Sequence, residues 1–226
     1  MMTQKKTKIS KAAAIFLIVM TVLSFANFIR IEIDGSLLKL AGLVVIIGVV
    51  AFFVTRGTGT NDSKDEGLDI KTVLSKMKSK KVIILALIPI VIDVMQIVIE
   101  KAFFPEILEH TVARIPFEID PAKVIPIILQ LLLLPLGEEI ALRAFYQKQM
   151  NKLTGFAPAL IIASFIFAIG HFSYGNPAIV VVDLAGVFID SIFYGLVFKE
   201  TDNAWCSWIS HSLADIAAVI VVMIIL

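Results

Sequence analysis

The sequence has few charged residues and a single cysteine, and both shortages narrow the classes of protein that it can encode. Only 17% of its 226 residues are charged, against about 25% in soluble domains. Disorder requires high charge and low hydrophobicity, so a disordered chain is excluded. One cysteine, Cys206, excludes a disulfide scaffold. A balance of 20 basic and 19 acidic residues argues against a nucleic-acid-binding protein.

Two common hydrolase signatures are also absent from the sequence. There is no Gly-x-Ser-x-Gly motif, so a serine nucleophile of the α/β-hydrolase type is unsupported. There is no His-Glu-x-x-His motif, which would indicate a zinc protease of the zincin type.

Apolar residues are abundant and make up 58% of the chain. A membrane-spanning helix needs about 20 mostly apolar residues. The apolar runs predict an all-α protein, a polytopic transmembrane helical bundle of about seven to eight membrane helices. The runs are 12–28, 37–54, 82–99, 124–136, 156–170, 178–198 and 204–226, of which the fourth and fifth are short for independent spans.

Polar segments between these runs predict the domains and the orientation. A Gly-, Thr- and Asp-rich stretch at 57–67 predicts an N-terminal two-helix membrane unit with a polar loop (1–81) and a catalytic helical bundle (82–226) with its core at about 124–226. Lysines concentrate before the first run and in the 56–81 loop, whereas the 30–36 and 101–121 loops are rich in acids. The positive-inside rule then predicts a cytoplasmic N-terminus.

Ionisable residues within membrane helices are costly, so each is a candidate functional residue. Glu138 and Glu139 are adjacent and follow a leucine-rich run. Glu139 and Arg143 are spaced i,i+4 and can form an ion pair on one helix face, with Glu138 about 100° away. His171 ends an apolar helix, and His211 and Asp215 share one face of the last helix. Each feature alone also admits a structural role at a helix end.

The spacing along the chain places Glu138 and His171 at the same depth. Their midpoint falls at the Thr154-Gly155 turn, so an antiparallel helix pair puts both about 24 Å from that turn. A carboxylate and an imidazole facing each other can hold and activate a water molecule. His211, oriented by Asp215, can stabilise the oxyanion that forms. Asp183 and Asp190 can accept hydrogen bonds from Arg143 or line a polar path.

The motifs Glu138-Glu139-x-x-x-Arg143, Phe167-x-x-x-His171 and His211-x-x-x-Asp215 occur in the order typical of one family. Over about 131–216 the chain resembles the CAAX protease and bacteriocin-processing (CPBP, or Abi) family of intramembrane proteases, related to the Ras-converting enzyme. The resemblance implies that Glu138 and His171 activate water, that His211 and Asp215 stabilise the oxyanion, and that Glu139 and Arg143 orient the site.

The sequence departs from the family pattern at two positions. Asp215 stands where asparagine is frequent, and Ser191 stands where glycine is frequent. An ionised aspartate would repel an oxyanion, so Asp215 must be protonated or serve only to orient His211.

Metal dependence stays open at this point. Glu138, His171, His211 and Asp215 also offer a set of oxygen and nitrogen ligands for Zn²⁺, which would make the protein a metalloprotease. We favour no cofactor and water activation without a metal.

The expected protein is an integral membrane protein of a bacterial plasma membrane. It would cut a peptide bond in a membrane-associated peptide or protein, such as a bacteriocin precursor. Its expected partners are that substrate and the lipid bilayer, and we expect no binding to nucleic acid. A non-catalytic bacteriocin-immunity or sensor protein on the same scaffold is the alternative. A proton- or ion-coupled transporter is a third class, but we find no internal repeat typical of transporters.

Overall fold

The computed structural model is a bundle of helices, and it describes residues 9–29, 32–33, 36–37, 40–58 and 67–225. Its α-helices are α1 (Lys11–Ala26), α2 (Ala41–Thr58), α3 (Val73–Met77), α4 (Lys80–Phe103), α5 (Pro105–Arg114), α6 (Val124–Glu138), α7 (Lys148–Thr154), α8 (Phe156–Gly170), α9 (Pro177–Thr201) and α10 (Ala204–Ile225). A π-helix, η3 (Glu139–Gln147), joins α6 to α7, and short 3₁₀ turns η1 (Ile70–Thr72) and η2 (Pro121–Lys123) precede α3 and α6. The strands β1 (Glu32–Ile33) and β2 (Ser36–Leu37) form a small antiparallel hairpin.

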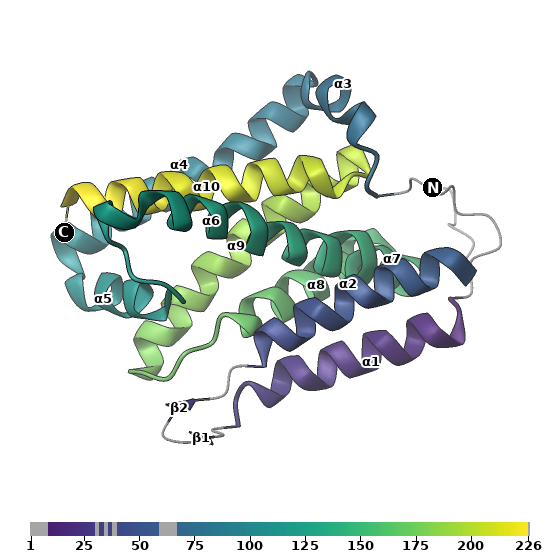
Figure 1. The fold of residues 1–226 in the computed structure, drawn as a ribbon, viewed down its shortest axis with the longest axis horizontal. Coiled ribbons are helices and arrows are strands. Elements are labelled where there is room, and N and C mark those ends of the chain that lie inside the picture. Colours follow the sequence, from purple (N-terminus) through teal and green to yellow (C-terminus); the bar gives the residue numbers. More distant parts are fainter. Residues whose placement is uncertain (1–8, 30–31, 34–35, 38–39, 59–66, 226) are drawn as a thin grey trace.

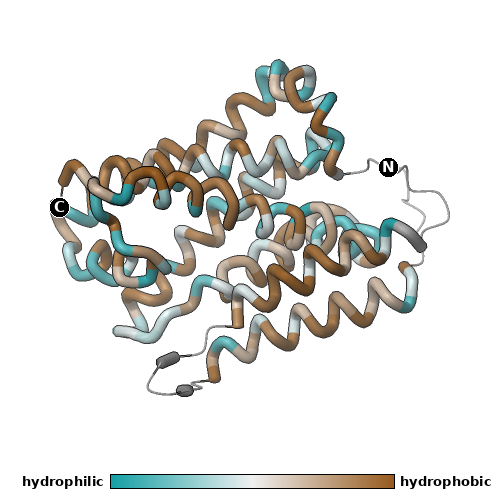
Figure 2. Tube along the Cα trace, in the orientation of Figure 1, coloured by the Kyte–Doolittle hydropathy of each residue, from teal (hydrophilic) through white to brown (hydrophobic). Residues whose placement is uncertain are grey.

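The long helices are apolar enough to cross a bilayer. Four helical segments meet the length and composition of a membrane span, and α1, α2 and α8 are apolar but shorter. Large apolar side chains also cover the outside of the bundle; Ile18, Leu133 and Ile224 are 63%, 66% and 76% exposed. A soluble protein rarely exposes so much apolar surface. Figure 2 shows this apolar character along the helices, with hydrophilic residues gathered on α5 and at helix ends. The chain is thus a helical integral membrane protein, and the exact number of spans remains a prediction.

The length of one expected membrane helix was underestimated. The run at 124–136 looked too short to cross a membrane, yet the helix that it begins continues through η3 and α7 to Thr154, 31 residues in all. The sequence hid this continuation because charged and polar residues of the motif region interrupt the apolar run. The turn that follows is where the sequence placed it, since Gly155 adopts φ +88°, a conformation that favours glycine.

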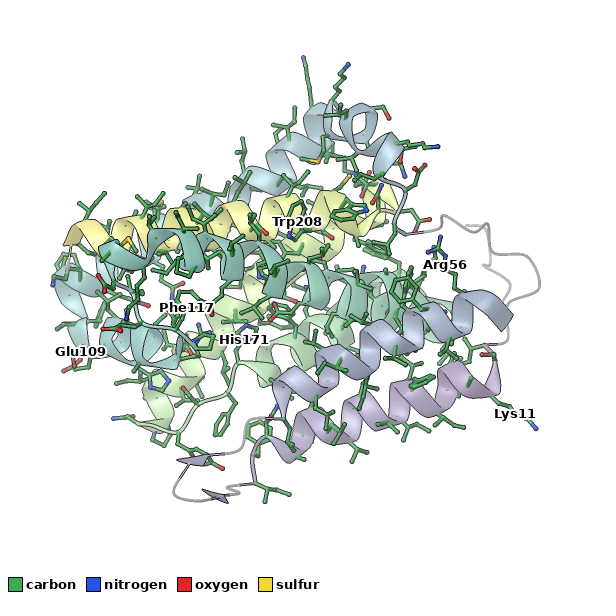
Figure 3. All side chains as sticks on the ribbon, in the orientation of Figure 1. Lys11, Arg56, Glu109, Phe117, His171 and Trp208 are labelled. Carbon is green, nitrogen blue, oxygen red and sulfur yellow. The ribbon has the colours of Figure 1, made fainter. Side chains whose placement is uncertain are left out.

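The helices are arranged with two chemically different ends. Figure 1 shows α5 and the β1–β2 hairpin at one end of the bundle and α3 and α7 at the other. Figure 3 places Lys11 and Arg56 at the α3 end and Glu109 at the α5 end. Helix α10 lies against α4, α6 and α9, and α8 packs against α9 and η3.

The N-terminal helices pack directly on the motif-bearing helix. Buried residues of α1 and α2 share a hydrophobic core with η3 and α8; Met20 and Ala51 are fully buried in it beside Phe145. A Cβ atom added at Gly48 of α2 would lie 2.5 Å from the Cβ of Ala141 in η3. Small residues allow such close backbone approach between membrane helices. The domain boundary near residue 81 stays a prediction, and most of the predicted linker 57–67 lies outside the described residues.

Candidate active site

The two adjacent glutamates lie where α6 changes into the π-helix η3. Glu138 is the last residue of α6, and Glu139 begins η3, all of whose residues are buried. Runs of π-helix are rare and frequently occur at functional sites. Here the change of helix type coincides with the residues that the sequence marks as chemically active.

Three carboxylates surround the imidazole of His211. Its Nδ1 lies 3.0 Å from Oε1 of Glu139, and the contact is a hydrogen bond. Its Nε2 lies 3.8 Å from Oε2 of Glu138 and 3.7 Å from Oδ2 of Asp215. His211 is only 5% exposed. The ring is therefore fixed through Nδ1, and Nε2 faces the remaining two acids.

The ion pair between Glu139 and Arg143 is present as the i,i+4 spacing predicted. Arg143 Nε lies 3.4 Å from Glu139 Oε2, and neither side chain is exposed. Arg143 also donates a 2.8 Å hydrogen bond from Nη2 to Oγ of Ser191, and its guanidinium lies over the ring of Phe167. Glu139 thus links Arg143 to His211, a connection that the sequence did not predict.

His171 is held at the end of α8. Its Nδ1 lies 3.0 Å from the carbonyl oxygen of Phe167, which can only accept a hydrogen bond. The Nδ1 atom therefore carries the proton, and Nε2 is the basic nitrogen of the neutral ring. The ring of Phe167 lies between the two histidines, 4.7 Å from His171 and 5.6 Å from His211.

A cavity of about 730 Å³ contains all four predicted catalytic side chains in its lining: Glu138, His171, His211 and Asp215. Glu138 and His171 thus line the same cavity, and the water that we expect between them stays a prediction. In Figure 3 the labelled His171 and Phe117, which both line this cavity, lie in the middle of the bundle. The space is large enough for water and an extended peptide segment.

The cavity occupies the half of the bundle toward α5. Besides residues of α6, α9 and α10, its lining includes the start of α2, the last turns of α4 and α8, and the segment 111–117 that contains the end of α5. Toward α3 and α7 the interior is filled by buried apolar side chains, among them Tyr146, Phe198 and Ala204. Within the described residues, no segment at the α3 end contributes to the lining.

The membrane aspartates have other partners than we expected. Asp183 contacts Arg114 of α5 at 3.0 Å through each of its oxygens, and Asp190 lies beside Asp93 of α4. Both aspartates line the cavity, which is one of the two roles that we expected. The other role is absent from the described contacts of Arg143, which are with Ser191 and Glu139.

The possible zinc ligands named from the sequence, Glu138, His171, His211 and Asp215, do not form a metal site. Within the part of the chain that the structure describes, no three His, Cys, Asp or Glu side chains are grouped closely enough to hold a metal ion. Zinc needs about four ligands at about 2.0–2.3 Å. The present arrangement does not fit such a site, and we derive no chemical step through a metal.

Two contributors to the site lacked a clear sequence signal. Tyr194 stacks on His211 with ring centroids 4.4 Å apart and an interplanar angle of 17°. Gln147 donates from Nε2 to the carbonyl oxygen of Gly195 at 3.0 Å, which ties η3 to α9. Both were unremarkable polar residues in the sequence. Only their burial, 2% and 3% exposed, marks them out.

Comparison with known proteins shows which family this region is similar to. The family model described as type II CAAX prenyl endopeptidase Rce1-like matches residues 120–217. No curated protein and no solved structure gave a match. The matched region contains α6, η3, α8, α9 and the six predicted site residues Glu138, Glu139, Arg143, His171, His211 and Asp215.

Residues 120–217, somewhat less than half of the chain, are thus similar to the Rce1-like type II CAAX prenyl endopeptidases. The match agrees with the resemblance drawn from the three sequence motifs. It does not extend to α1, α2, α4 or the segment 111–117, which also contribute to the cavity wall.

Proposed function

We propose that the protein is an intramembrane endopeptidase that hydrolyses a peptide bond in a membrane-associated peptide or protein. The observation that carries this proposal is the convergence of Glu138, Asp215 and Glu139 on the imidazole of His211. This cluster borders a cavity inside a bundle whose outer surface is apolar. A hydrolytic site in that position is accessible to water and to a peptide held near the bilayer.

In the proposed mechanism Glu138 is the general base. Its carboxylate takes a proton from a water molecule held between Glu138 and His171, and the hydroxide attacks the carbonyl carbon of the scissile bond. The carbonyl π electrons move to oxygen and form an oxyanion. When the intermediate collapses, the C–N bond breaks and Glu138 returns the proton to the leaving amine.

His211 and Asp215 form the opposite side of the site. As an imidazolium, His211 donates from Nδ1 to Glu139 and from Nε2 toward the oxyanion, where a fixed donor stabilises developing charge. Asp215, at 3.7 Å from Nε2, orients the ring. Glu139 and Arg143 are positioning residues, since they hold His211 without reaching the cavity lining.

Substitution of Glu138 is the direct test. We expect Glu138→Gln to lower cleavage of a membrane-anchored reporter peptide by at least about 100-fold, because general-base catalysis contributes about 10²–10⁴-fold. The assay uses the full chain in proteoliposomes, and thermal unfolding in detergent verifies folding. Glu109→Gln is the matched control, since Glu109 is an exposed acid outside the cavity.

The same assay separates the alternative functions. Wild-type cleavage rates in Glu138→Gln and His171→Ala would contradict the proposed mechanism, whereas absence of cleavage by the wild-type protein would favour an immunity or sensor role. Ion flux into proteoliposomes that depends on Asp183 would indicate a transporter.

Cleavage without a resident metal is a further expectation. We expect unchanged activity after exhaustive chelation followed by dialysis, measured with the same reporter peptide. Two results together would contradict this expectation. The purified wild type would contain stoichiometric zinc that His211→Ala lacks, and the chelated wild type would regain activity when Zn²⁺ is added.

A further inference from the structure

The cavity carries far more acidic than basic groups. Its described lining includes six carboxylates: Asp93, Glu100, Glu138, Asp183, Asp190 and Asp215. Arg114 is the one arginine or lysine among the described lining residues, and both oxygens of Asp183 already contact it at 3.0 Å. A cavity with this charge balance attracts cations and repels anionic groups.

Most of these carboxylates have a partner within the site. Glu138 and Asp215 face His211, Asp183 contacts Arg114, and Asp93 and Asp190 lie close together. No ion pair is described for Glu100. Its only described hydrogen bond is to Oε1 from the neutral amide of Gln96, at 2.7 Å.

Glu100 is buried and partly unsatisfied. It is 4% exposed, and its Oε2 atom has no hydrogen-bond partner among the described residues although the side chain lines the cavity. Leaving a buried polar atom without a partner costs about 1–3 kcal/mol, and more for a charged group. A partner that arrives with the substrate would satisfy this atom.

Gly186 protects the hydrogen bond that holds Glu100. On the facing helix α9, a Cβ atom added at Gly186 would lie only 2.9 Å from Oε1 of Gln96. A larger residue there would displace the amide that donates to Glu100.

The position of Glu100 along α4 sets its distance from Asp93, which also lines the cavity. Asp93 lies on the same face seven residues earlier, a separation of about 10 Å at about 1.5 Å per residue. An extended peptide covers this length in about three residues, at about 3.3 Å each. Glu100 lies nearer the α5 end, where the cavity lining reaches the end of the bundle.

We propose that Glu100 forms a subsite for a cationic side chain, lysine or arginine, of the peptide substrate. The cation would lie about three residues, along an extended peptide, from the part of the substrate beside Asp93. This placement rests on the proposed function, but the recognition of a cation does not. The ammonium or guanidinium donates to Oε2 of Glu100, a charge-assisted hydrogen bond that is about twice as strong as a neutral one.

The test is peptide binding to a chain that cannot cut. The Glu138→Gln protein in detergent is titrated with two short apolar peptide amides. One contains a single central lysine, and the other has the uncharged norleucine at that position. We expect the lysine peptide to bind about tenfold more tightly, and adding Glu100→Gln to abolish that difference. Glu109→Gln, which removes an exposed acid outside the cavity, should preserve it.

Each outcome decides the assignment. Equal binding of both peptides to Glu138→Gln overturns the subsite, and this result uses no variant of Glu100. A lysine preference that survives Glu100→Gln, with folding verified by thermal unfolding in detergent, also overturns it. Glu100→Asp, which retains the charge, should restore part of the preference. Lysine-selective binding with no cleavage by the wild type would contradict the proposed protease and leave the subsite intact.

Discussion

Glu139 connects the two charged side chains that hold the centre of the site together. One carboxylate oxygen accepts from His211 at 3.0 Å, and the other lies 3.4 Å from Arg143. The i,i+4 spacing along one helix was enough to predict the contact with Arg143. The contact with His211 joins helices that are 72 positions apart in sequence, so no local pattern could reveal it.

Removal of the Glu139 carboxylate should lower the stability of the protein. We expect Glu139→Ala to reduce the free energy of unfolding by about 3–5 kcal/mol, because it leaves Arg143 buried and without its ion-pair partner. Glu139→Gln keeps a hydrogen-bond acceptor for His211 and should lose less. Unfolding in mixed detergent micelles measures both. A stability equal to wild type in Glu139→Ala would contradict the role of the pair.

At the scale of elements, the approach of α2 to η3 depends on a single glycine. A Cβ atom at Gly48 would lie 2.5 Å from Cβ and 2.9 Å from Cα of Ala141, two residues after Glu139. Both helices must therefore remain close for the site to keep its shape. The sequence marked α2 only as an apolar helix, and its contact with the motif helix emerged from the packing.

Two alanine substitutions in α2 separate packing from helix propensity. We expect Gly48→Ala to destabilise the protein by about 1–3 kcal/mol through overpacking, and to lower cleavage by shifting η3. Gly42→Ala in the same helix should not destabilise, since no atom lies within 4 Å of the added Cβ. Unfolding and cleavage are measured on both. Equal effects of the two substitutions would show that the close approach is unimportant.

At the scale of the whole molecule, the cavity and the lysine-rich segments lie toward opposite ends. Described lysines at 71, 76, 78 and 80 belong to the α3 end, whereas the cavity reaches the α5 end. If the lysine-rich end is cytoplasmic, as the positive-inside rule predicts, the site opens to the other side of the membrane. Its substrates would then approach from outside the cytoplasm.

Cysteine labelling tests this orientation, and the single native cysteine makes it practical. Cys206 is buried and unpaired, so Cys206→Ala provides a background without thiols. We expect Glu118→Cys to react with a membrane-impermeant maleimide in intact cells, and Lys78→Cys only after permeabilisation, since both positions are exposed at opposite ends. The reverse pattern would contradict the predicted topology.

The sequence alone determined the membrane class, the apolar helices, the turn at Gly155 and the chemical identity of the site, because hydrophobicity, glycine conformation and i,i+4 spacing are local properties. Only the tertiary structure decided the pairing: Glu139 with His211, Ser191 with Arg143, and Asp183 with Arg114. Each of these contacts depends on how a helix is rotated about its axis and how closely its neighbour approaches. Those quantities follow from the packing of the whole bundle, and no single segment specifies them.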